Sequence, residues 1–581
     1  MVHSRKCISL RCFLNQLDSP QKPGGREGRE TTPGRVPPPP TTDRPSGTDV
    51  AFAPRVPSSL PLDPLLPRAS DRTLWAGVAS GLLLGFALAP RATGPLVFVA
   101  LIPLIAVLDA APPLRLAMRA GFACGLVFFW MGFQWVPFAG TGGIGVLAFL
   151  IFPPALALPV AGFACAAAWL RRFGRTTLLV AAPALWVTTE LVRPTSELGS
   201  QFHLGYSLAN HPALIQLAAL GGVHLVSLWI VAVNAALVGA VLAPRRVVPM
   251  LVALTILPCA FGAAALRSAP RPPPERRITV AGVQPAVREH ERHVPARFDD
   301  HLRELLVLSE GTLGDRPDLI IWPESAFEGM SPAAGAPFLG AIAHHLGTPL
   351  LSGVWRLAEG EPASLRNSSL LATPDGDVRI AADKVNPIWM YESAPGSPLG
   401  QRVAVAGIWP GRFARGPIPD VLLVPRARAP LHLGVLVCVD ATFPELARDL
   451  RRRGAELLVT IANEADSGRL TSGLEARIAR VRAVENRVPL VRVANTGPSE
   501  WVDALGQVVA SIEPGASRAW TASLDLGESA PPYTRFGDAP TAGVAIATPA
   551  FLAALGVARQ KRRTSRGRDP VPLTLTPENR A

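Results

Sequence analysis

The chain has 581 residues, with 57 Lys and Arg against 44 Asp and Glu, and its formal net charge is +13. It is 49% hydrophobic and only 17% charged, and its mean hydropathy is +0.27. That composition is too apolar for an ordinary soluble protein and indicates membrane spans. A nucleic-acid-binding protein is disfavoured because the positive charge lies in the tails and short loops, not on a basic face with aromatic side chains. Six scattered cysteines are too few for a disulfide framework.

The chain begins with residues 1–70, which are rich in Pro, Gly, Arg and Ser. This composition predicts a disordered cytosolic extension. No apolar segment follows the first basic residues, so the beginning does not have the pattern of a signal peptide.

Apolar runs then predict seven membrane spans and, near the other end of the chain, an eighth. We place them near 74–90, 94–110, 118–139, 144–170, 176–193, 213–243, 247–266 and 542–558. Every second connection carries arginines, as cytosolic loops do, in the segments PPLRLAMR, RRFGR and PRR. This places the N-terminus in the cytosol and the chain from residue 270 to the last span outside, which is the periplasm in a Gram-negative cell; the last span returns the chain to the cytosol. The basic run RQKRRTSRGR after the last span agrees.

The predicted domains follow from this division: a membrane domain at 71–270, a soluble domain at 275–530, a last membrane helix at 541–560 and a basic cytosolic tail at 561–581. In the soluble domain, short β-like runs such as RITVAGVQ, LIIW, LHLGVLVCV and ELLVTIAN alternate with helical stretches such as RFDDHLRELLVLSEG and FPELARDLRRRG. Strands separated by helices predict a layered α/β fold.

Lysine is nearly absent from this arginine-rich chain, and Lys384 is the one lysine outside the terminal regions, which hold Lys6, Lys22 and Lys561. A lysine at this one position suggests that a planar guanidinium cannot replace a compact ammonium there.

Two further reactive residues follow predicted strands. Cys438 lies between an apolar strand and a helix, where the N–H groups of the following turn can lower a thiol pKa or hold an oxyanion. Glu324 follows an apolar strand and Trp322–Pro323, and a carboxylate in such a pocket can act as a general base. Each is weak evidence alone, but Glu, Lys and Cys in this order, all at strand ends, form a specific pattern.

With this pattern the chain resembles the nitrilase superfamily, and the spans around it resemble the apolipoprotein N-acyltransferase family over about 74–560. Other matching segments are WVTTELVR (186–193), LGYSLANHPALIQLAALGGVHLVSLWIVAVNAAL (204–237), RNSSLLATPDG (366–376) and RVRAVENRVPLVRVANTG (480–497). The resemblance implies eight transmembrane helices and an extracytoplasmic nitrilase-like α-β-β-α sandwich. It also implies residence in the bacterial inner membrane.

The resemblance further implies a ping-pong acyl transfer. Glu324 takes the proton of Cys438, the thiolate attacks an ester of a phospholipid such as phosphatidylethanolamine, and Lys384 stabilises the oxyanion. The α-amine of the diacylglyceryl-cysteine of an apolipoprotein then attacks the thioester. No metal or cofactor is implied. Glu392, eight residues after the lysine, matches a further Glu of the family, and Asp440 stands where the family has Glu.

Four more residues are candidates for substrate binding: Glu190, Arg193, Tyr206 and Asn463. Glu190 and Arg193 lie three apart on one helical face near a span end, where a carboxylate is costly unless paired and often functional. A structural i,i+3 pair at the interface is the equally weighted alternative.

The residues around the three depart from the family pattern. The segment after the lysine is VNPIWMYE, Val439–Asp440 replaces Tyr–Glu, NEADSG (463–468) lacks the usual aromatic residues, and Gln284–Val287 reads QPAV. These changes leave two other hypotheses open: a membrane-tethered amidase on the same scaffold, and a non-catalytic paralogue. His344–His345 is not expected to bind a metal, and the Gly-rich segment 140–149 is expected to be a membrane turn because no strand precedes it.

Overall fold

The computed structural model describes residues 69–89, 93–138, 143–193, 197–268, 273–292, 294–326, 335–357, 365–388, 392–393, 413–426, 428–464, 473–527 and 529–566. The expected extension lies outside these residues apart from its last two, and so does the basic tail beyond residue 566.

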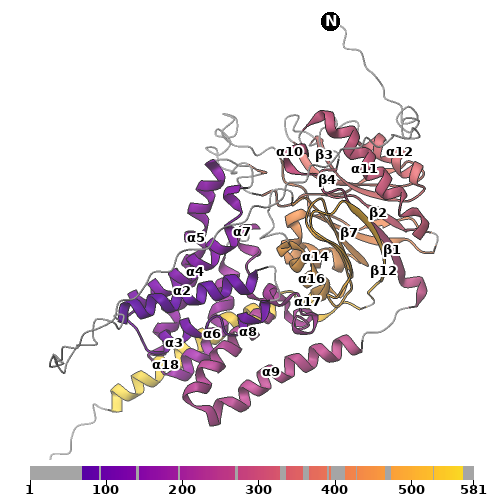
Figure 1. The fold of residues 1–581 in the computed structure, drawn as a ribbon. Coiled ribbons are helices and arrows are strands. Elements are labelled where there is room, and N and C mark those ends of the chain that lie inside the picture. Colours follow the sequence, from indigo (N-terminus) through magenta and orange to yellow (C-terminus); the bar gives the residue numbers. More distant parts are fainter. Residues whose placement is uncertain are drawn as a thin grey trace, which may run out of the picture. The chain divides into compact units, whose positions relative to one another are not determined.

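The first half of the described chain is helical (Figure 1). Its α-helices are α2 (Ala69–Leu88), α3 (Ile102–Asp109), α4 (Leu114–Phe133), α5 (Gly143–Arg171), α6 (Arg175–Val192), α7 (Glu197–Ser200), α8 (Ala218–Leu242) and α9 (Pro244–Arg267). Short 3-10 turns between them are η1 (Gly94–Phe98), η2 (Val136–Phe138), η3 (Leu204–Leu208) and η4 (Pro212–Leu214). At the other end of the chain, α17 (Pro532–Phe536) precedes the long α18 (Ala539–Arg566).

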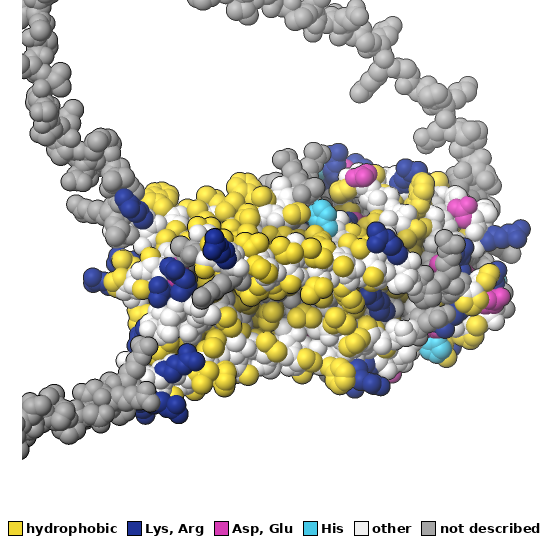
Figure 2. Space-filling model, turned by 90° about the horizontal axis from the view of Figure 1, so that it is seen from below, with side chains coloured by type: hydrophobic (Ala, Val, Ile, Leu, Met, Phe, Trp, Pro, Cys, Tyr) yellow, Lys and Arg dark blue, Asp and Glu magenta, His cyan; other side chains and the backbone are white. Residues whose placement is uncertain are grey.

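Five of the described helices are long and apolar enough to cross a membrane: Leu114–Phe133, Gly145–Arg171, Ala218–Val241, Val247–Arg267 and Ala539–Arg562. Large apolar side chains are exposed on them, for example Leu150, Ile151, Ile256, Leu257 and Phe551. Figure 2 shows hydrophobic side chains over much of one face, with Lys and Arg toward its ends. Such a surface fits contact with lipid better than contact with water.

Three predicted spans are not continuous helices. In the predicted 118–139 span, α4 ends at Phe133 and η2 follows. The predicted 94–110 span is divided into η1 and α3, and each begins with a proline in its first turn, where the missing N–H costs nothing. The predicted 213–243 span begins as η4, and its helix starts only at Ala218. Within α8 the backbone breaks at Gly221 and Gly222, and Gly222 has φ 72°. A side chain other than glycine would be strained at that angle.

Close helix packing explains the glycines of α2. Gly77, Gly81 and Gly85 are spaced by four and face α4, and a Cβ at Gly81 would collide with the carbonyl group of Cys124. Small residues at this spacing let two helix backbones approach, as in membrane helix pairs. The contact therefore follows from a pattern that hydropathy alone does not reveal.

Two six-stranded sheets make up the second half. The first has the order β12-β1-β2-β3-β4-β5 and the second β11-β10-β9-β8-β7-β6. The strands are β1 (Arg277–Gln284), β2 (Leu319–Ile321), β3 (Leu350–Leu357), β4 (Leu365–Ala372), β5 (Val378–Asp383), β6 (Leu422–Val424), β7 (Leu431–Val437), β8 (Leu457–Ala462), β9 (Leu490–Ala494), β10 (Ser499–Val502), β11 (Val508–Ile512) and β12 (Arg518–Asp525). Strands β1, β2 and β3 pair in parallel, and so do β7, β8 and β9.

Helices cover the two sheets. α11 (Phe298–Glu310) and α12 (Gly335–Leu346) contact the first, whereas α14 (Pro444–Arg452) and α16 (Leu474–Asn486) contact the second. The remaining short turns are α10 (Glu289–Arg292), η5 (Pro274–Arg276), η6 (Pro295–Arg297), η7 (Leu313–Asp315) and η8 (Cys438–Thr442). This is the expected α-β-β-α sandwich.

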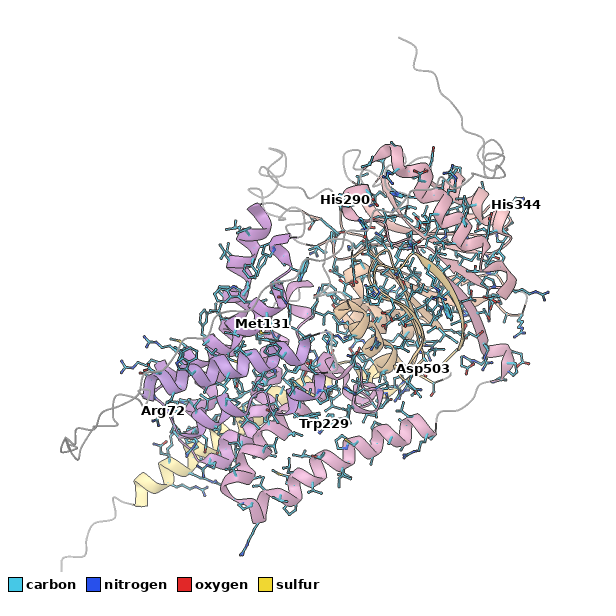
Figure 3. All side chains as sticks on the ribbon, viewed as in Figure 1. Arg72, Met131, Trp229, His290, His344 and Asp503 are labelled. Carbon is cyan, nitrogen blue, oxygen red and sulfur yellow. The ribbon has the colours of Figure 1, made fainter. Side chains whose placement is uncertain are left out.

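The core between the sheets is made of buried hydrophobic side chains, and Figure 3 draws the side chains of this region among its strands. Trp501 of the second sheet is fully buried, and its indole donates a hydrogen bond to the carbonyl oxygen of Val280 in the first sheet (2.9 Å). Its ring occupies the space that a Cβ at Gly282 would need. The packing fixes the two sheets against each other, and with them the strand ends that bear the reactive residues.

Helix α16 joins the sandwich to the helical half. Arg477 donates to the carbonyl oxygen of Leu88 (2.6 Å), and Arg480 donates to Asn210 (2.7 Å). Near the turn that follows β7, the hydroxyl oxygens of Ser200 and Thr442 lie 2.9 Å apart. The connections between helices α2, α6 and α8 therefore contact the sandwich directly.

Candidate active site

Three strands of the sandwich each end next to one of the reactive residues. Glu324 follows β2, Lys384 comes directly after β5, and Cys438 comes directly after β7. Cys438 has φ 54°, so the chain turns sharply at the thiol as β7 passes into η8. A non-glycine residue held in this region is strained, and such residues cluster at functional sites.

The ammonium group of Lys384 lies between two carboxylates. Its Nζ atom is 3.1 Å from Oε1 of Glu324 and 2.8 Å from Oε1 of Glu392. Asn367 of β4 donates from Nδ2 to the same two oxygen atoms, at 2.6 Å to Glu324 and 3.3 Å to Glu392. All four side chains are buried, and Lys384 is only 1% exposed.

The charges of this group act on the thiol. Burial raises the pKa of Cys438 well above its ordinary value, the negative charge of Glu324 raises it further, and Lys384 opposes the rise. Burial by itself lowers the pKa of Lys384, but the charges of Cys438, Glu324 and Glu392 outweigh it and raise that pKa well above the usual range. Both shifts favour a charged lysine and oppose ionisation of the thiol, so formation of the thiolate calls for a base.

Asp440 fixes the segment that carries the lysine. Its carboxylate accepts hydrogen bonds from the backbone N–H groups of Val385 (3.0 Å) and Asn386 (2.9 Å). Burial raises the pKa of Asp440 to about 6 although these hydrogen bonds oppose the rise. Glu392 closes the segment from the other end, since its Oε2 accepts from the N–H of Ile388 (2.8 Å). Both carboxylates thus position Lys384.

A small pocket opens beside Glu324. Asn463 and Asn495 line it together with Ser325, and the amide group of Asn495 donates to Oδ1 of Asn463 (3.1 Å). Its volume is about 30 Å³, which is enough for one water molecule. The structure therefore places Asn463 next to the predicted base.

Similar proteins agree with this architecture. The model of the apolipoprotein N-acyltransferase N-terminal domain matches residues 80–236, and that of carbon-nitrogen hydrolase matches 278–531. An apolipoprotein N-acyltransferase from Geobacter metallireducens is 30% identical over 511 residues, which cover 83% of this chain and 95% of the relative. The chain belongs to the apolipoprotein N-acyltransferase family.

A second member of the apolipoprotein N-acyltransferase family, from Allorhizobium ampelinum, is 30% identical over 447 residues, which cover 72% of this chain and 82% of the relative. Among solved structures, a carbon-nitrogen hydrolase from Helicobacter pylori is 20% identical, with a TM-score of 0.32. The match covers 43% of this chain and 89% of that chain.

Two residues of the site, Asn367 and Arg492, were not predicted from the sequence of this apolipoprotein N-acyltransferase family member. Asn367 lies inside a segment used for the resemblance, but nothing in its surroundings singles it out. Arg492 is different, because a fully buried arginine in the apolar strand LVRVA is itself a signal. It contacts Glu464 (2.5 Å) and Glu475 (3.4 Å), and burial raises the pKa of Glu464 to about 7. The charges of Glu475 and Arg492 both interact with Cys438.

Three of the residues predicted to bind substrate lie in buried contacts. Arg193 is 3.4 Å from Oε1 of Glu190, as the i,i+3 spacing predicts, and it donates to the carbonyl oxygen of Phe202 (2.8 Å). The hydroxyl group of Tyr206 accepts a hydrogen bond from Arg482 of α16. These contacts favour the structural alternative for the pair.

The two adjacent histidines lie on the outer side of the sandwich, where Figure 3 labels His344. Nδ1 of His344 is 2.8 Å from the carbonyl oxygen of Pro374, and Nε2 of His345 is 2.8 Å from Glu310. Each therefore has an ordinary surface partner.

Proposed function

We propose that this protein transfers a fatty acyl chain from a phospholipid, through a thioester on Cys438, to the α-amine of the diacylglyceryl-cysteine of an apolipoprotein. The arrangement of Lys384 between Glu324 and Glu392, next to Cys438, carries the proposal. Its relatives are named for this activity. We further propose phosphatidylethanolamine as the donor.

In the first half-reaction the carboxylate of Glu324 removes the proton of Cys438, and Sγ forms a bond to the ester carbonyl carbon. Lys384, held protonated by its neighbours, stabilises the negative charge that develops on the carbonyl oxygen. The ester C–O bond breaks, and the departing lysophospholipid oxygen takes the proton from Glu324. The products are lysophospholipid and a Cys438 thioester.

The second half-reaction uses the same groups in reverse. The α-amine of the acceptor attacks the thioester carbon, and Glu324 takes the proton that the amine loses. The C–S bond breaks, and the proton passes from Glu324 to the thiolate, which restores the starting enzyme. Neither step requires a redox partner, because no atom is oxidised or reduced in either acyl transfer.

We propose that eight helical segments place the sandwich on the periplasmic side of the bacterial inner membrane. Asp109, at the end of α3, binds both Arg171 (2.9 Å) and Arg175 (2.8 Å), which brings three predicted cytosolic helix ends together. Arg172 and Arg559 line a common pocket, so the basic end of α18 lies there too. The sandwich contacts the opposite ends of the helices, at Leu88 and Asn210 among others.

We propose Asn463 as a contact for substrate, because it lines the pocket beside Glu324. For Glu190, Arg193 and Tyr206 we propose a positioning role, because each is buried and contacts a neighbouring charged or polar side chain. They would hold the connection between α6 and α8 against α16.

The test is the mass of the intact protein. The full chain in detergent is incubated with phosphatidylethanolamine, beside the Cys438→Ala variant and a matched control, Cys165→Ala, which removes a thiol of α5. We expect one fatty-acyl increment on the wild type and on Cys165→Ala, and none on Cys438→Ala. When a diacylglyceryl lipopeptide is added next, the protein should lose the fatty-acyl increment and the lipopeptide should gain it.

Three results would contradict the proposal. An increment that persists in Cys438→Ala would mean that another group carries the acyl chain. Release of free fatty acid or hydrolysis of small amides, without acylation of the lipopeptide, would support the membrane-tethered amidase. If neither acylation nor hydrolysis occurs while phospholipid or lipopeptide still binds, the non-catalytic alternative holds.

A further inference from the structure

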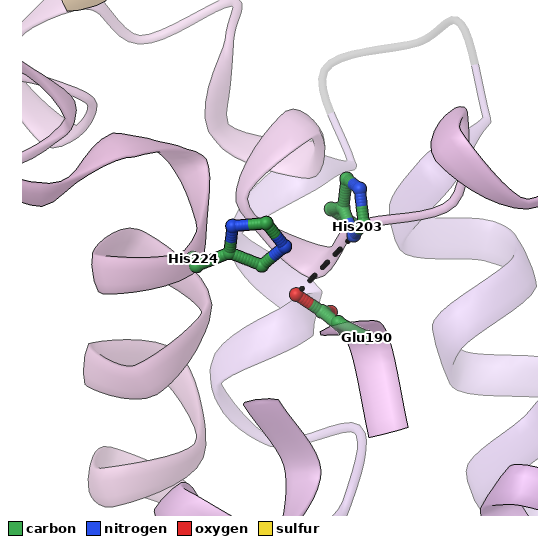
Figure 4. Close-up of side chains that lie close together, drawn as sticks. All are labelled: Glu190, His203 and His224. Carbon is green, nitrogen blue, oxygen red and sulfur yellow. Dashed lines mark ion pairs between the residues drawn. The ribbon is translucent and has the colours of Figure 1, made fainter. Parts of the chain in front are cut away.

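A second group of reactive side chains lies at the ends of the membrane helices. Glu190 comes from α6, His203 directly precedes η3, and His224 comes from α8. Each offers one ligand atom, and these atoms all lie within 4.8 Å of one another. Figure 4 shows the carboxylate between the two imidazole rings. All three residues are buried.

Among the described residues, one polar atom of each side chain has no partner within hydrogen-bond geometry: Oε2 of Glu190, Nδ1 of His203 and Nε2 of His224. The first two of these atoms form an ion pair at 3.5 Å. A buried polar atom without a partner costs about 1–3 kcal/mol, and native structures contain few of them. Because the 3.5 Å contact between two of these atoms is too long for a good hydrogen bond, the three poorly satisfied atoms indicate a shared partner.

The opposite atoms of two of these side chains are well occupied. Oε1 of Glu190 accepts from the indole of Trp186 and from the N–H of Leu204, both at 3.0 Å. Nδ1 of His224 lies 2.7 Å from the carboxylate of Asp538, directly before α18. An ionised carboxylate only accepts, so it holds the proton on Nδ1 and leaves the lone pair on Nε2. A histidine fixed by a carboxylate in this way is the usual support of a metal ligand.

The distances fit a small cation. Nδ1 of His203 lies 3.5 Å from Oε2 of Glu190. Two ligand atoms about 2.0 to 2.1 Å from a tetrahedral zinc ion lie about 3.3 to 3.4 Å apart. Little movement is therefore needed for these two groups to share one ion.

The local charge also accommodates a cation. With neutral histidines, Glu190 and Asp538 are negative and Arg193 is positive, while the adjacent Arg482 and Glu485 pair with each other (2.7 Å). The set is thus negative by one charge. Arg193 contacts Oε1 of Glu190, not the Oε2 atom that faces His203.

We infer that Glu190, His203 and His224 form a binding site for a divalent transition-metal ion, with Zn²⁺ as its occupant. Two imidazole nitrogens and one carboxylate oxygen are ligands that zinc accepts, and they leave its fourth position for water. The ion would join α6, the segment before η3 and α8, and through Asp538 it would also hold the start of α18. Its role is to fix helix ends that contact the sandwich, independently of the acyl transfer proposed above.

The test measures metal content and needs no activity. The full chain, purified in detergent with a tag that contains no histidine, is stripped with a chelator, loaded with Zn²⁺ and desalted, and its zinc is counted. The double variant His203→Gln/His224→Gln removes two ligands, Glu190→Gln removes the anionic one, and His211→Gln is the matched control from the same region.

We expect one zinc ion per chain for the wild type and for His211→Gln, and affinity at least about tenfold weaker for the other variants. Zinc should also raise the unfolding temperature of the wild type, because a ligand that binds only the folded state stabilises it. A wild type that retains no zinc, or a double variant that retains as much as the wild type, would overturn the inference.

If the double variant cannot be purified, a measurement on the wild type alone still tests whether the metal site exists. Cobalt can replace zinc, and a tetrahedral Co²⁺ site with histidine ligands absorbs visible light, whereas hydrated Co²⁺ absorbs weakly. A visible spectrum that saturates at one Co²⁺ per chain and disappears when Zn²⁺ is added would support the site. Its absence would mean that Glu190 and the histidines are held together by a proton instead.

Discussion

Nζ of Lys384 lies 3.1 Å from Oε1 of Glu324, although 60 residues separate them in the sequence. Because Nζ also touches Glu392 at 2.8 Å, the ammonium must fit a buried space between two carboxylates. We expect Lys384→Arg to lower the rate of thioester formation by at least about a hundredfold, the cost of losing one oxyanion-stabilising group. The larger planar guanidinium cannot occupy this space with the same geometry. Formation of the acyl-enzyme, followed by intact mass, measures the effect.

The control for this substitution is Lys561→Arg, which changes the other lysine among the described residues, on the exposed end of α18. It should behave as the wild type does. Normal turnover by Lys384→Arg would show that only the positive charge matters, and the explanation for the isolated lysine would then be wrong.

Asn367 provides a second test. Its amide group donates to both carboxylates that flank the lysine. We expect Asn367→Ala to slow acylation of the lipopeptide by about ten- to a hundredfold, because the carboxylates lose their alignment while the reactive groups remain. Ser369→Ala, on the same strand and with only a 3.4 Å contact to the carbonyl oxygen of Ala382, is the matched control. Equal rates for the two variants would remove Asn367 from the site.

The sequence predicted the elements that carry chemistry because their signals are local. The strand predicted at 277–284 forms β1, whereas the runs LIIW and LHLGVLVCV form strands that end one and two residues earlier, at Ile321 and Val437. The segment predicted as one span at 94–110 is divided because Pro95 and Pro103 each begin a new helical turn. Hydropathy does not register these prolines, so the prediction missed the division.

Contacts between distant segments could not be predicted in this way. Asn367 meets Glu324 only after β4 and β2 have taken their places in one sheet, and Asn residues elsewhere in the chain have the same local appearance. The same holds for His203 and His224, whose approach depends on the packing of α6 and α8. Resemblance supplied the roles of Glu324, Lys384 and Cys438, but not these partners.

The pKa of Asp440 predicts how stability depends on pH. Folding raises this pKa from 3.8 to about 6, so the folded chain binds more protons than the unfolded chain between these values. The contribution of Asp440 to stability is therefore largest below about pH 4, falls as the pH rises to about 6, and is constant above that. Asp440→Asn should flatten this part of the profile of unfolding temperature against pH.

The matched control for Asp440→Asn is Asp377→Asn, which changes an exposed carboxylate paired with Arg379 (2.6 Å). It should leave the profile between pH 4 and about 6 as it is in the wild type. If Asp440→Asn retained the full wild-type slope, other buried carboxylates would be responsible for it, among them Glu464, whose pKa burial raises to about 7.

Tyr206 tests the junction between the helices and the sandwich. Its hydroxyl group accepts a hydrogen bond from Arg482, and both side chains are fully buried. Tyr206→Phe keeps the ring but removes the acceptor, so a donor of the buried guanidinium loses its partner, and we expect a loss of about 1–3 kcal/mol in the free energy of unfolding. Arg482→Gln alone and the double variant complete a mutant cycle, with unfolding in detergent as the readout. A coupling energy near zero would mean that the hydrogen bond does not hold α16 to the connection between α6 and α8.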